Sequence, residues 1–279
     1  MTHVWLDGRL QDVREARISP FDHGLLVGDG VFETLRVYGA TPFAWRRHLD
    51  RLEASARGLG LAVPDRAELR AGADALLEAD GVTDGRLRVT ITGGPAPLGS
   101  ERGTGAPTVL MAAAPIGPWP VPGEVVVVPW PRNERGATAG LKTISYAENV
   151  RALAYASERN ATEAVFGNTR GELCEATGSN VFVVSDGVVR TPAAESGCLL
   201  GVTRALVLEL CAADGIPSEE ATLPLDALAT ADEAFLTSTT REVQAIGRVD
   251  GHALASAPGP LTARLDAAFR ALVARDLDP

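Results

Sequence analysis

The chain has 279 residues, of which 46% are hydrophobic and 22% are charged, so it is long enough for one large folded domain or two modest ones. Its formal net charge of -10 argues against nucleic acid or an anionic membrane as the main partner. No stretch is apolar for long enough to span a bilayer, and the N-terminus lacks the basic and apolar regions of a signal peptide.

The N-terminal region contains both helix-like and strand-like patterns. Apolar residues at helical spacing predict a helix over residues 46–59, and a second helix is expected over 66–79. Residues 86–92 alternate basic and apolar side chains, which indicates a half-buried strand. Further strands are expected at 4–6 and 31–38. Residues 93–105 are rich in glycine and proline and are expected to form a loop.

A proline-rich stretch divides the chain, because its prolines exclude a regular helix or a central strand. We place an interdomain linker at 116–123, between a small N-terminal domain at 1–115 and a larger C-terminal domain at 124–279. In the C-terminal domain we expect strands at 124–129, 163–166, 180–184, 188–191 and 233–237, and helices at 148–159, 203–213 and 261–274. This mixture predicts a mixed α/β (α+β) fold class.

The three cysteines, Cys174, Cys198 and Cys211, have no metal-ligand spacing, and the histidines provide none either. We therefore expect reduced thiols, no metal site and a cytoplasmic location.

Lys142 is the first candidate for chemistry, because lysine is rare in a chain whose basic residues are almost all arginine. It lies between the strand predicted at 124–129 and the helix predicted at 148–159. Desolvation of a lysine at such a junction lowers its pKa and makes the amine nucleophilic towards an aldehyde. Position alone favours an ordinary solvated lysine, so the interpretation depends on residues elsewhere.

Four other features support a site for an anionic, aromatic cofactor. The helix opening at Gly201-Val-Thr-Arg204 offers free backbone N–H groups and the Thr203 hydroxyl to an anion, although Thr203 also fits a plain N-cap. Thr237-Ser-Thr-Thr240 places four hydroxyls after a strand, where a phosphate or a polar turn could lie. Arg51 is a cation on a predicted helix, where a surface salt bridge would be the default. Glu175 lies in a small-residue turn, where a buried carboxylate needs a cationic partner such as a protonated pyridine nitrogen.

Together these segments resemble the class-IV aminotransferases over nearly the whole chain. That family includes branched-chain aminotransferases, D-amino acid transaminases, R-selective amine transaminases and aminodeoxychorismate lyases. The segments that carry the resemblance are Gly28-Asp-Gly-Val-Phe-Glu-Thr34, His48-Leu-Asp-Arg-Leu52, Leu141-Lys-Thr143, Glu175-Ala-Thr-Gly-Ser-Asn180, Leu200-Gly-Val-Thr203 and Ser238-Thr-Thr-Arg-Glu-Val243.

The resemblance implies fold type IV, a homodimer, and pyridoxal 5'-phosphate bound between the domains. It implies that Lys142 forms a Schiff base with the cofactor and shuttles the proton, that Glu175 pairs with the pyridine nitrogen, and that Arg51 grips the phosphate. It also implies a set of residues that complete the phosphate cup or line the cofactor. These residues are Val202, Thr203, Thr239, Tyr146 and Asn149.

The substrate site departs from the pattern of D-amino acid transaminases, which hold the substrate carboxylate with a tyrosine, an arginine and a histidine. The matching positions here are Phe32, Leu98 and Ser100. Another cation must therefore bind an amino acid carboxylate. Arg88 is our first candidate, Arg241 beside Thr240 is the second, and Arg86 or Arg102 is the third.

The motifs Gly28-Asp-Gly-Val31 and Ser238-Thr-Thr-Arg-Glu-Val243 most resemble D-amino acid transaminases. We therefore expect amino-group transfer between an amino acid, D-amino acids favoured, and a 2-keto acid. Aminodeoxychorismate lyase, which releases pyruvate and 4-aminobenzoate, is the alternative, and a branched-chain L-amino acid aminotransferase is a further one. A binding protein that has kept the fold without activity would be expected to lack Lys142, Glu175 or Arg51, and all three are present.

Overall fold

The structure, a computed structural model, describes residues 1–279 and contains two compact units. The first unit comprises Met1–Gly117, Leu141–Tyr146 and Asp276–Pro279, and the second comprises the remainder of the chain. The boundary at residue 117 falls within the predicted linker. Two short segments from later in the sequence nevertheless belong to the first unit, and one of them carries Lys142.

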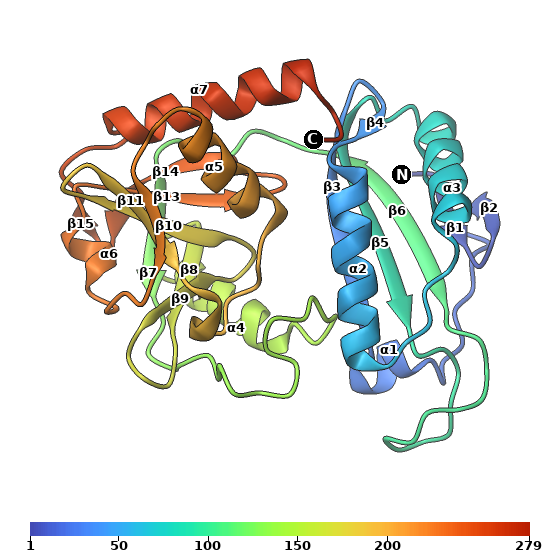
Figure 1. Ribbon diagram of the computed structural model, residues 1–279. Helices are drawn as coiled ribbons and strands as arrows, with labels where there is room; N and C mark the ends of the chain where they lie inside the picture. The colour runs from blue at the N-terminus through green and yellow to red at the C-terminus, as the bar shows by residue number, and fades with distance from the viewer. The chain divides into compact units, whose positions relative to one another are not determined.

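The first unit is built on a six-stranded antiparallel sheet with the order β2-β1-β6-β5-β3-β4. Its strands are β1 (His3–Leu6), β2 (Arg9–Asp12), β3 (Gly30–Tyr38), β4 (Thr41–Pro42), β5 (Asp84–Thr92) and β6 (Val109–Pro115). Its helices are α1 (His23–Val27), α2 (Trp45–Leu59) and α3 (Arg66–Asp80). Figure 1 shows α2 and α3 running beside these strands.

Side-chain alternation decides which face of this sheet is covered. Leu87, Val89 and Ile91 of β5 are buried in the apolar core with residues of α2 and α3, whereas Arg86 and Arg88 point to the opposite face. The helices have clear ends. Asp65, for example, accepts hydrogen bonds from the backbone N–H groups of residues 67 and 68 at the start of α3.

The second unit is built on a mixed sheet with the order β12-β11-β10-β13-β14-β7-β8-β9, and β15 pairs with β14. The strands are β7 (Gly123–Val127), β8 (Glu163–Gly167), β9 (Leu173–Ala176), β10 (Asn180–Ser185), β11 (Val188–Pro192), β12 (Ser218–Ala221), β13 (Glu233–Ser238), β14 (Glu242–Val249) and β15 (His252–Ala253). The sheet curls, because the edge strand β9 lies close to β10 in its middle.

Helices pack against this curled sheet within the second unit. They are α4 (Ala147–Ser157), α5 (Val202–Ala213), α6 (Ala227–Thr230) and α7 (Pro260–Arg275), with a short 3-10 turn η1 (Ala194–Ser196). α4 packs on β8, whereas α5 and α7 pack on each other and on β13. The stacked rings of Phe182 and Phe235, 4.8 Å apart, lie in the interior of the unit.

The structure confirms each helix and strand that was predicted, with boundaries that shift by three residues or fewer. It adds elements that were not predicted, of which β6, β9 and β14 matter most. The prediction that Glu175 lies in a turn was wrong, because Glu175 is the third residue of β9. A four-residue strand with a glutamate inside it carries too little alternation to be recognised.

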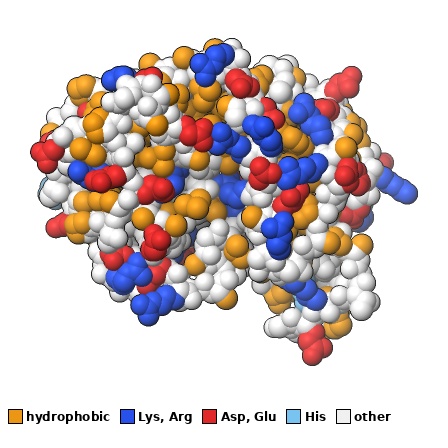
Figure 2. Space-filling view, viewed as in Figure 1, with side chains coloured by type: hydrophobic (Ala, Val, Ile, Leu, Met, Phe, Trp, Pro, Cys, Tyr) orange, Lys and Arg blue, Asp and Glu red, His pale blue; other side chains and the backbone are white.

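Charged side chains of both signs are distributed over the surface. Figure 2 shows acidic and basic side chains interspersed over the visible face, without a large region of one sign. None of the helices combines the length and the apolar character needed to cross a bilayer.

A carboxylate on the sheet holds the start of α7 in the second unit. Buried Glu233 of β13 accepts from the backbone N–H of Leu261 at 3.1 Å and of Thr262 at 2.8 Å. We expect Glu233→Ala to lower the free energy of unfolding by about 2 kcal/mol, because two helix N–H groups lose a charged acceptor. Urea unfolding followed by circular dichroism measures this.

Asp266→Ala is the control, because Asp266 lies on the same helix in an exposed pair with Arg270 and should contribute less than about 1 kcal/mol. Equal losses in the two variants would contradict the capping role of Glu233.

Candidate functional site

One face of the first sheet gathers Lys142, Phe32, Arg88 and Tyr146. The Arg88 guanidinium carbon lies 3.6 Å from the centre of the Phe32 ring, and Lys142 Nζ lies 4.4 Å from the same centre. Tyr146 meets Phe32 edge to face at 5.1 Å, and Lys142 Nζ is 5.9 Å from the Tyr146 ring. Two cations therefore share one aromatic platform, an arrangement that attracts an anionic group.

The backbone around Lys142 is fixed by the first unit, not by the end of β7. Phe32 N–H donates to the Lys142 carbonyl at 3.0 Å, Lys142 N–H donates to Ser55 Oγ at 3.1 Å, and Ile144 N–H donates to the Gly30 carbonyl at 2.9 Å. The predicted position of Lys142 at a strand-to-helix junction is thus only half right. Lys142 lies five residues before α4, but it pairs with β3 in the manner of an added strand. It is also the only lysine in the sequence.

A buried carboxylate orients Arg51. Glu33 of β3 is fully buried and accepts from Arg51 Nε at 2.7 Å and from Arg51 Nη2 at 2.8 Å. His48, one turn earlier on α2, contacts the same carboxylate through Nδ1 at 2.8 Å, and Nδ1 carries the proton because a carboxylate only accepts. Glu33 therefore binds the Nε and Nη2 side of the Arg51 guanidinium, and Nη1 points away from Glu33.

The charges of this cluster follow from its burial. Burial opposes ionisation of Glu33, but the charge and hydrogen bonds of Arg51, helped by His48, hold the pKa of Glu33 well below its ordinary value. Burial lowers the pKa of His48, against the opposing effect of Glu33. At neutral pH the cluster is an ionised carboxylate, a neutral imidazole and a charged guanidinium.

Arg88 is a cation without a carboxylate partner in the chain. Its Nε donates to Thr90 Oγ1 at 3.2 Å, and its other contact is the Phe32 ring. The side chain is accessible to solvent, although the surrounding protein desolvates the guanidinium enough to lower the pKa of Arg88. A positive charge in this state is suited to binding an anion.

The second unit places Glu175 in a network of hydrogen bonds. Arg132 Nη1 donates to Glu175 Oε1 at 3.0 Å, and the Leu199 N–H donates to Glu175 Oε2 at 2.9 Å. Arg132 Nη2 donates to Asn149 Oδ1 at 2.8 Å, while the Asn149 amide donates to the Thr177 carbonyl. Asn149, which the resemblance assigned to the cofactor, thus supports Arg132 in the structure.

The start of α5 forms a polar cradle in the same unit. No side chain caps the helix at Gly201, and the first bond within the helix runs from the Ala205 N–H to the Gly201 carbonyl, so the N–H groups of Val202 and Thr203 precede the helical ladder. A Cβ at Gly201 would collide with the Asn180 carboxamide. Two hydroxyls without a hydrogen-bond partner, Ser179 Oγ and Thr237 Oγ1, are buried beside Asn180 in sequence or strand register.

Three predicted site residues, Thr239, Thr240 and Arg241, directly follow β13. Thr239 and Thr240 form the turn to β14. Arg241, in contrast, is buried, ion-paired with Glu163 at 3.2 Å, and stacked 3.7 Å over the Trp119 ring. Arg241 is therefore a structural cation, and this weakens its candidacy for substrate binding.

The predicted loop at 93–105 is held to its own unit by Arg102. Arg102 pairs with Asp29 and donates to the carbonyls of Leu59 at 2.6 Å and Gly60 at 2.9 Å. These contacts occupy Arg102, so it too is a weaker candidate than Arg88. Leu98 and Ser100 lie on the exposed part of this loop.

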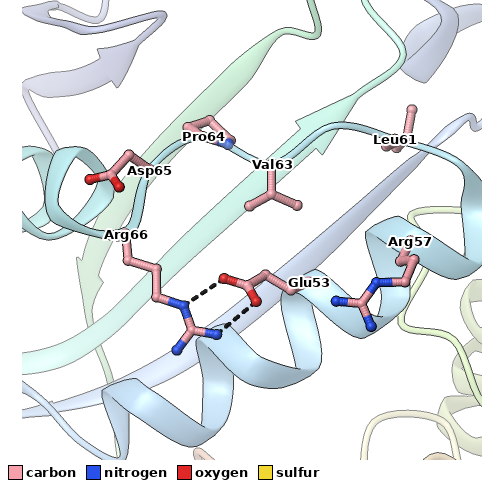
Figure 3. A pocket seen from close by; sticks show the side chains of 7 residues that line it. All are labelled: Glu53, Arg57, Leu61, Val63, Pro64, Asp65 and Arg66. Carbon is pink, nitrogen blue, oxygen red and sulfur yellow. Dashed lines mark hydrogen bonds and ion pairs between the residues drawn. The ribbon is translucent and has the colours of Figure 1, made fainter.

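A hollow of about 530 Å³ lies where α2 ends and α3 begins, as Figure 3 shows. Arg66 reaches across it to Glu53, with Nε to Oε1 at 2.5 Å and Nη2 to Oε2 at 2.7 Å. None of the predicted site residues lines this hollow, and its main cation is already neutralised, so we do not assign a function to it.

Sequence reasoning missed Glu33, His48 and Arg132. Glu33 and His48 lie within segments that carried the family resemblance, and the strand and the helix that contain them were predicted, but neither residue was assigned a role. Arg132 follows a proline in an irregular segment and offered no spacing that links it to Glu175. Charged residues inside apolar strands, such as Glu33, are the signal that could have indicated a buried ion pair.

Comparison with known proteins gives a consistent result. A family described as amino-transferase class IV matches residues 30–249. A putative branched-chain-amino-acid aminotransferase of Methanocaldococcus jannaschii is 33% identical over 275 residues, covering 96% of this chain and 95% of the relative. A D-alanine aminotransferase of Bacillus licheniformis is 34% identical over 271 residues, covering 96% of this chain and 95% of the relative.

The fold is shared with solved structures of these enzymes. The branched-chain aminotransferase of the archaeon Thermoproteus uzoniensis, solved with norvaline, matches with a TM-score of 0.90 and 31% identity, covering 98% of this chain and 94% of that chain. A further branched-chain amino acid aminotransferase with the same fold was solved with pyridoxamine 5'-phosphate. The predicted fold class, a mixed α/β protein of fold type IV, is confirmed.

The Glu33 cluster leads to a prediction about pH and stability. Because the folded-state pKa of Glu33 lies below its ordinary value of 4.5, ionised Glu33 stabilises the fold above pH 4.5, and this contribution is lost as the pH falls below it. We expect Glu33→Gln to cost about 3 kcal/mol at neutral pH, since Arg51 loses its buried partner, and to flatten the loss of stability below pH 4.5.

Urea unfolding at several pH values measures both effects. Glu53→Gln is the matched control, because Glu53 of α2 pairs with Arg66 of α3 in a partly exposed ion pair that should contribute less than about 1 kcal/mol. An acid-induced loss that is as steep in Glu33→Gln as in the wild type would refute the role of Glu33.

Proposed function

The chain belongs to the class IV amino-transferase family, whose members depend on pyridoxal phosphate, and we propose that it transfers amino groups between amino acids, D-amino acids foremost, and 2-keto acids. The single observation that carries the substrate assignment is Arg88, a partly desolvated cation that has no carboxylate partner and lies over the same ring as Lys142. An α-carboxylate is the anion that every amino acid and 2-keto acid brings.

The residues present fit the cofactor. A phosphate needs several N–H and O–H donors, and the start of α5 with Val202 and Thr203, together with Thr239, provides such a set. Buried hydroxyls without partners at positions 179 and 237 mark the same region as incomplete without a polar group. The family resemblance assigns a further phosphate contact to Arg51, whose guanidinium Glu33 holds within the first unit.

Glu175 fits a protonated ring nitrogen, because a buried carboxylate that is already hydrogen-bonded on both oxygens still has lone pairs for one further donor. When bound, pyridoxal phosphate supplies an aldehyde for bonding to an amine and a ring that withdraws electrons from the substrate Cα. Tyr146 and Phe32 would line the site beside Lys142, whereas Asn149 acts through Arg132.

In the proposed reaction Lys142 has two tasks. Its amine would hold the cofactor, and once a substrate amine had displaced it, the released Lys142 Nζ would be free to take the proton from the substrate Cα. The rings of Phe32 and Tyr146 lie beside Nζ and would keep the amine on the face of the sheet that carries Arg88. Arg88 holds the substrate carboxylate, and Thr240 adds a polar group after β13.

Two sequence features support D-amino acids as the preferred donors. The motifs at 28–31 and 238–243 are similar to those of D-amino acid transaminases, and the Bacillus licheniformis relative is named as a D-alanine aminotransferase. The clamp of Arg102 on Asp29 makes the loop less suited to a substrate with two carboxylates, which lowers the weight of the lyase alternative.

We also propose that the protein acts as a homodimer in the cytoplasm. Apolar side chains are exposed around α1 and on the loop at 93–105. A hydrogen bond from the Ala96 N–H to the Phe21 carbonyl connects this loop to the segment before α1. The exposed apolar side chains are Phe21, Leu25, Leu26, Val27 and Leu98. Such a patch is typical of a protein interface. Three buried free cysteines are consistent with a reducing compartment.

The absorbance spectrum of the purified protein, titrated with single D- and L-amino acids, tests the proposed function. A transaminase loses the absorbance of bound pyridoxal phosphate on addition of its amino acid and regains it on addition of a 2-keto acid. The enantiomers that respond identify the donor. If bound cofactor is present and no amino acid converts it, amino-group transfer is the wrong assignment and aminodeoxychorismate becomes the compound to test.

Lys142 gives the most direct prediction. We expect Lys142→Ala to lose activity by more than about 10³-fold and to form no covalent bond with the cofactor, because the sequence has no other lysine. Borohydride reduction followed by peptide mass spectrometry measures the bond, with label at Lys142 in the wild type as the control. A cofactor-labelled side chain in Lys142→Ala would contradict the assignment.

Arg88 gives a prediction about substrate binding. We expect Arg88→Met to raise the KM for amino acid and keto acid by about 10- to 100-fold with a smaller change in kcat, because a charged hydrogen bond to the carboxylate is lost. Arg86→Met is the matched comparison. Arg86, our third candidate, lies two residues earlier on the same face of β5 but does not stack on the Phe32 ring, so this variant should change KM little. If steady-state kinetics showed an unchanged KM in Arg88→Met, the substrate carboxylate would have to be bound by another residue.

A further inference from the structure

Arg132 is held rigidly in the second unit. Its N–H donates to the Gly167 carbonyl at 2.8 Å, and its backbone forms a bridge with Asn168 next to the end of β8. The guanidinium carbon lies 4.2 Å from the centre of the buried Phe166 ring. An arginine fixed at its backbone and stacked along its side chain can adopt few other rotamers.

The rigid guanidinium divides its hydrogen bonds between two acceptors. Nη1 donates to Glu175 Oε1 at 3.0 Å, and Nη2 donates to Asn149 Oδ1 at 2.8 Å. Asn149 is itself buried and anchored by its amide to the Thr177 carbonyl. This chain of contacts sets the position of the Glu175 carboxylate, and the Leu199 N–H fixes its second oxygen.

Resting on the proposed function, in which Glu175 faces the cofactor's ring nitrogen, we infer that Arg132 is a positioning residue that keeps Glu175 an oriented carboxylate, so that the shared proton stays on the ring nitrogen. Arg132 would act only through Glu175, the residue that the proposed function pairs with the ring nitrogen.

Electrostatics explains the direction of this effect. A proton shared between Glu175 and a ring nitrogen can lie on either atom. Arg132 contacts the carboxylate directly, whereas a ring nitrogen hydrogen-bonded to Glu175 would be farther from Arg132. The charge of Arg132 would therefore oppose protonation of Glu175 more strongly than protonation of the ring. The proton therefore favours the ring.

Other titratable groups near Glu175 do not replace Arg132. Cys174 and Cys198 lie nearby, and burial raises the pKa of both thiols, so they are neutral at physiological pH. Glu148 lies 3.8 Å from Arg132 at the exposed end of the network and bears the opposite charge. Arg132, in contrast, is a positive group in direct contact with Glu175.

The test reads the ring proton directly. The holoenzyme is prepared with pyridoxal phosphate that carries ¹⁵N in the ring, and the ¹⁵N chemical shift reports whether that nitrogen is protonated. Cofactor affinity is measured in parallel by titration of the cofactor-free protein. We expect a protonated nitrogen in the wild type, a shift towards the unprotonated value in Arg132→Met, and cofactor affinity lower by about 10- to 100-fold.

Two further variants make the result specific. Arg132→Lys restores a positive charge with one donor group and should recover most of the ¹⁵N shift but not all of the affinity. Arg135→Met is the matched control, because Arg135 is an exposed arginine of the same segment whose only ion pair, with Glu134, spans 3.7 Å, and it should behave as the wild type.

A ¹⁵N shift in Arg132→Met that equals the wild-type shift overturns the inference. An unprotonated ring nitrogen in the wild type also overturns it. This second measurement does not depend on whether Arg132→Met folds. An Arg132→Lys variant that resembles Arg132→Met also overturns it. Failure of the proposed function looks different, because the wild type would then bind no pyridoxal phosphate or would not respond to any amino acid.

Discussion

The buried ion pair between Glu33 and Arg51 links the packing of the first unit to the direction of a functional cation. Glu33 lies on the core face of β3, between Val31 and Leu35, where an unpaired carboxylate would be very unfavourable. The rotation of α2 that buries its apolar stripe also turns Arg51 and His48 towards Glu33. The rotation of α2 about its axis thus determines both the packing of the core and the orientation of the Arg51 side chain.

The same requirement sorts the remaining arginines into structural and available ones. Arg241 and Arg132 each contact a carboxylate of the second unit, and Arg102 contacts Asp29 in the first. Their charges are compensated inside the protein, so a substrate would have to compete with an existing partner. Arg88 and Arg86 both lack such a partner, and of the two it is Arg88 that lies over the Phe32 ring beside Lys142, which makes it the better placed to bind an external carboxylate.

The sequence predicted elements whose apolar residues follow a regular period, and it failed where local pattern carries no information. The alternation in β5 and the helical stripe of α2 each specify a buried face without knowledge of the fold. The burial of Glu175 within β9 and its contact with Arg132, 43 residues away in sequence, depend on tertiary pairing. Residue types for the candidate site were therefore predictable, whereas the partners that set their charge and orientation were not.

Lys142 shows how fixed and movable parts are combined. A catalytic amine must be held near its target and yet move between bonded and proton-carrying positions. The backbone on either side of Lys142 is tied to β3 and to Ser55 by directional hydrogen bonds, while the contacts of Nζ with Phe32 and Tyr146 are ring contacts that tolerate displacement. Because the segment pairs with β3, the strand that carries Glu33 also places the lysine, so an error in β3 register would displace the amine and the Arg51 partner together.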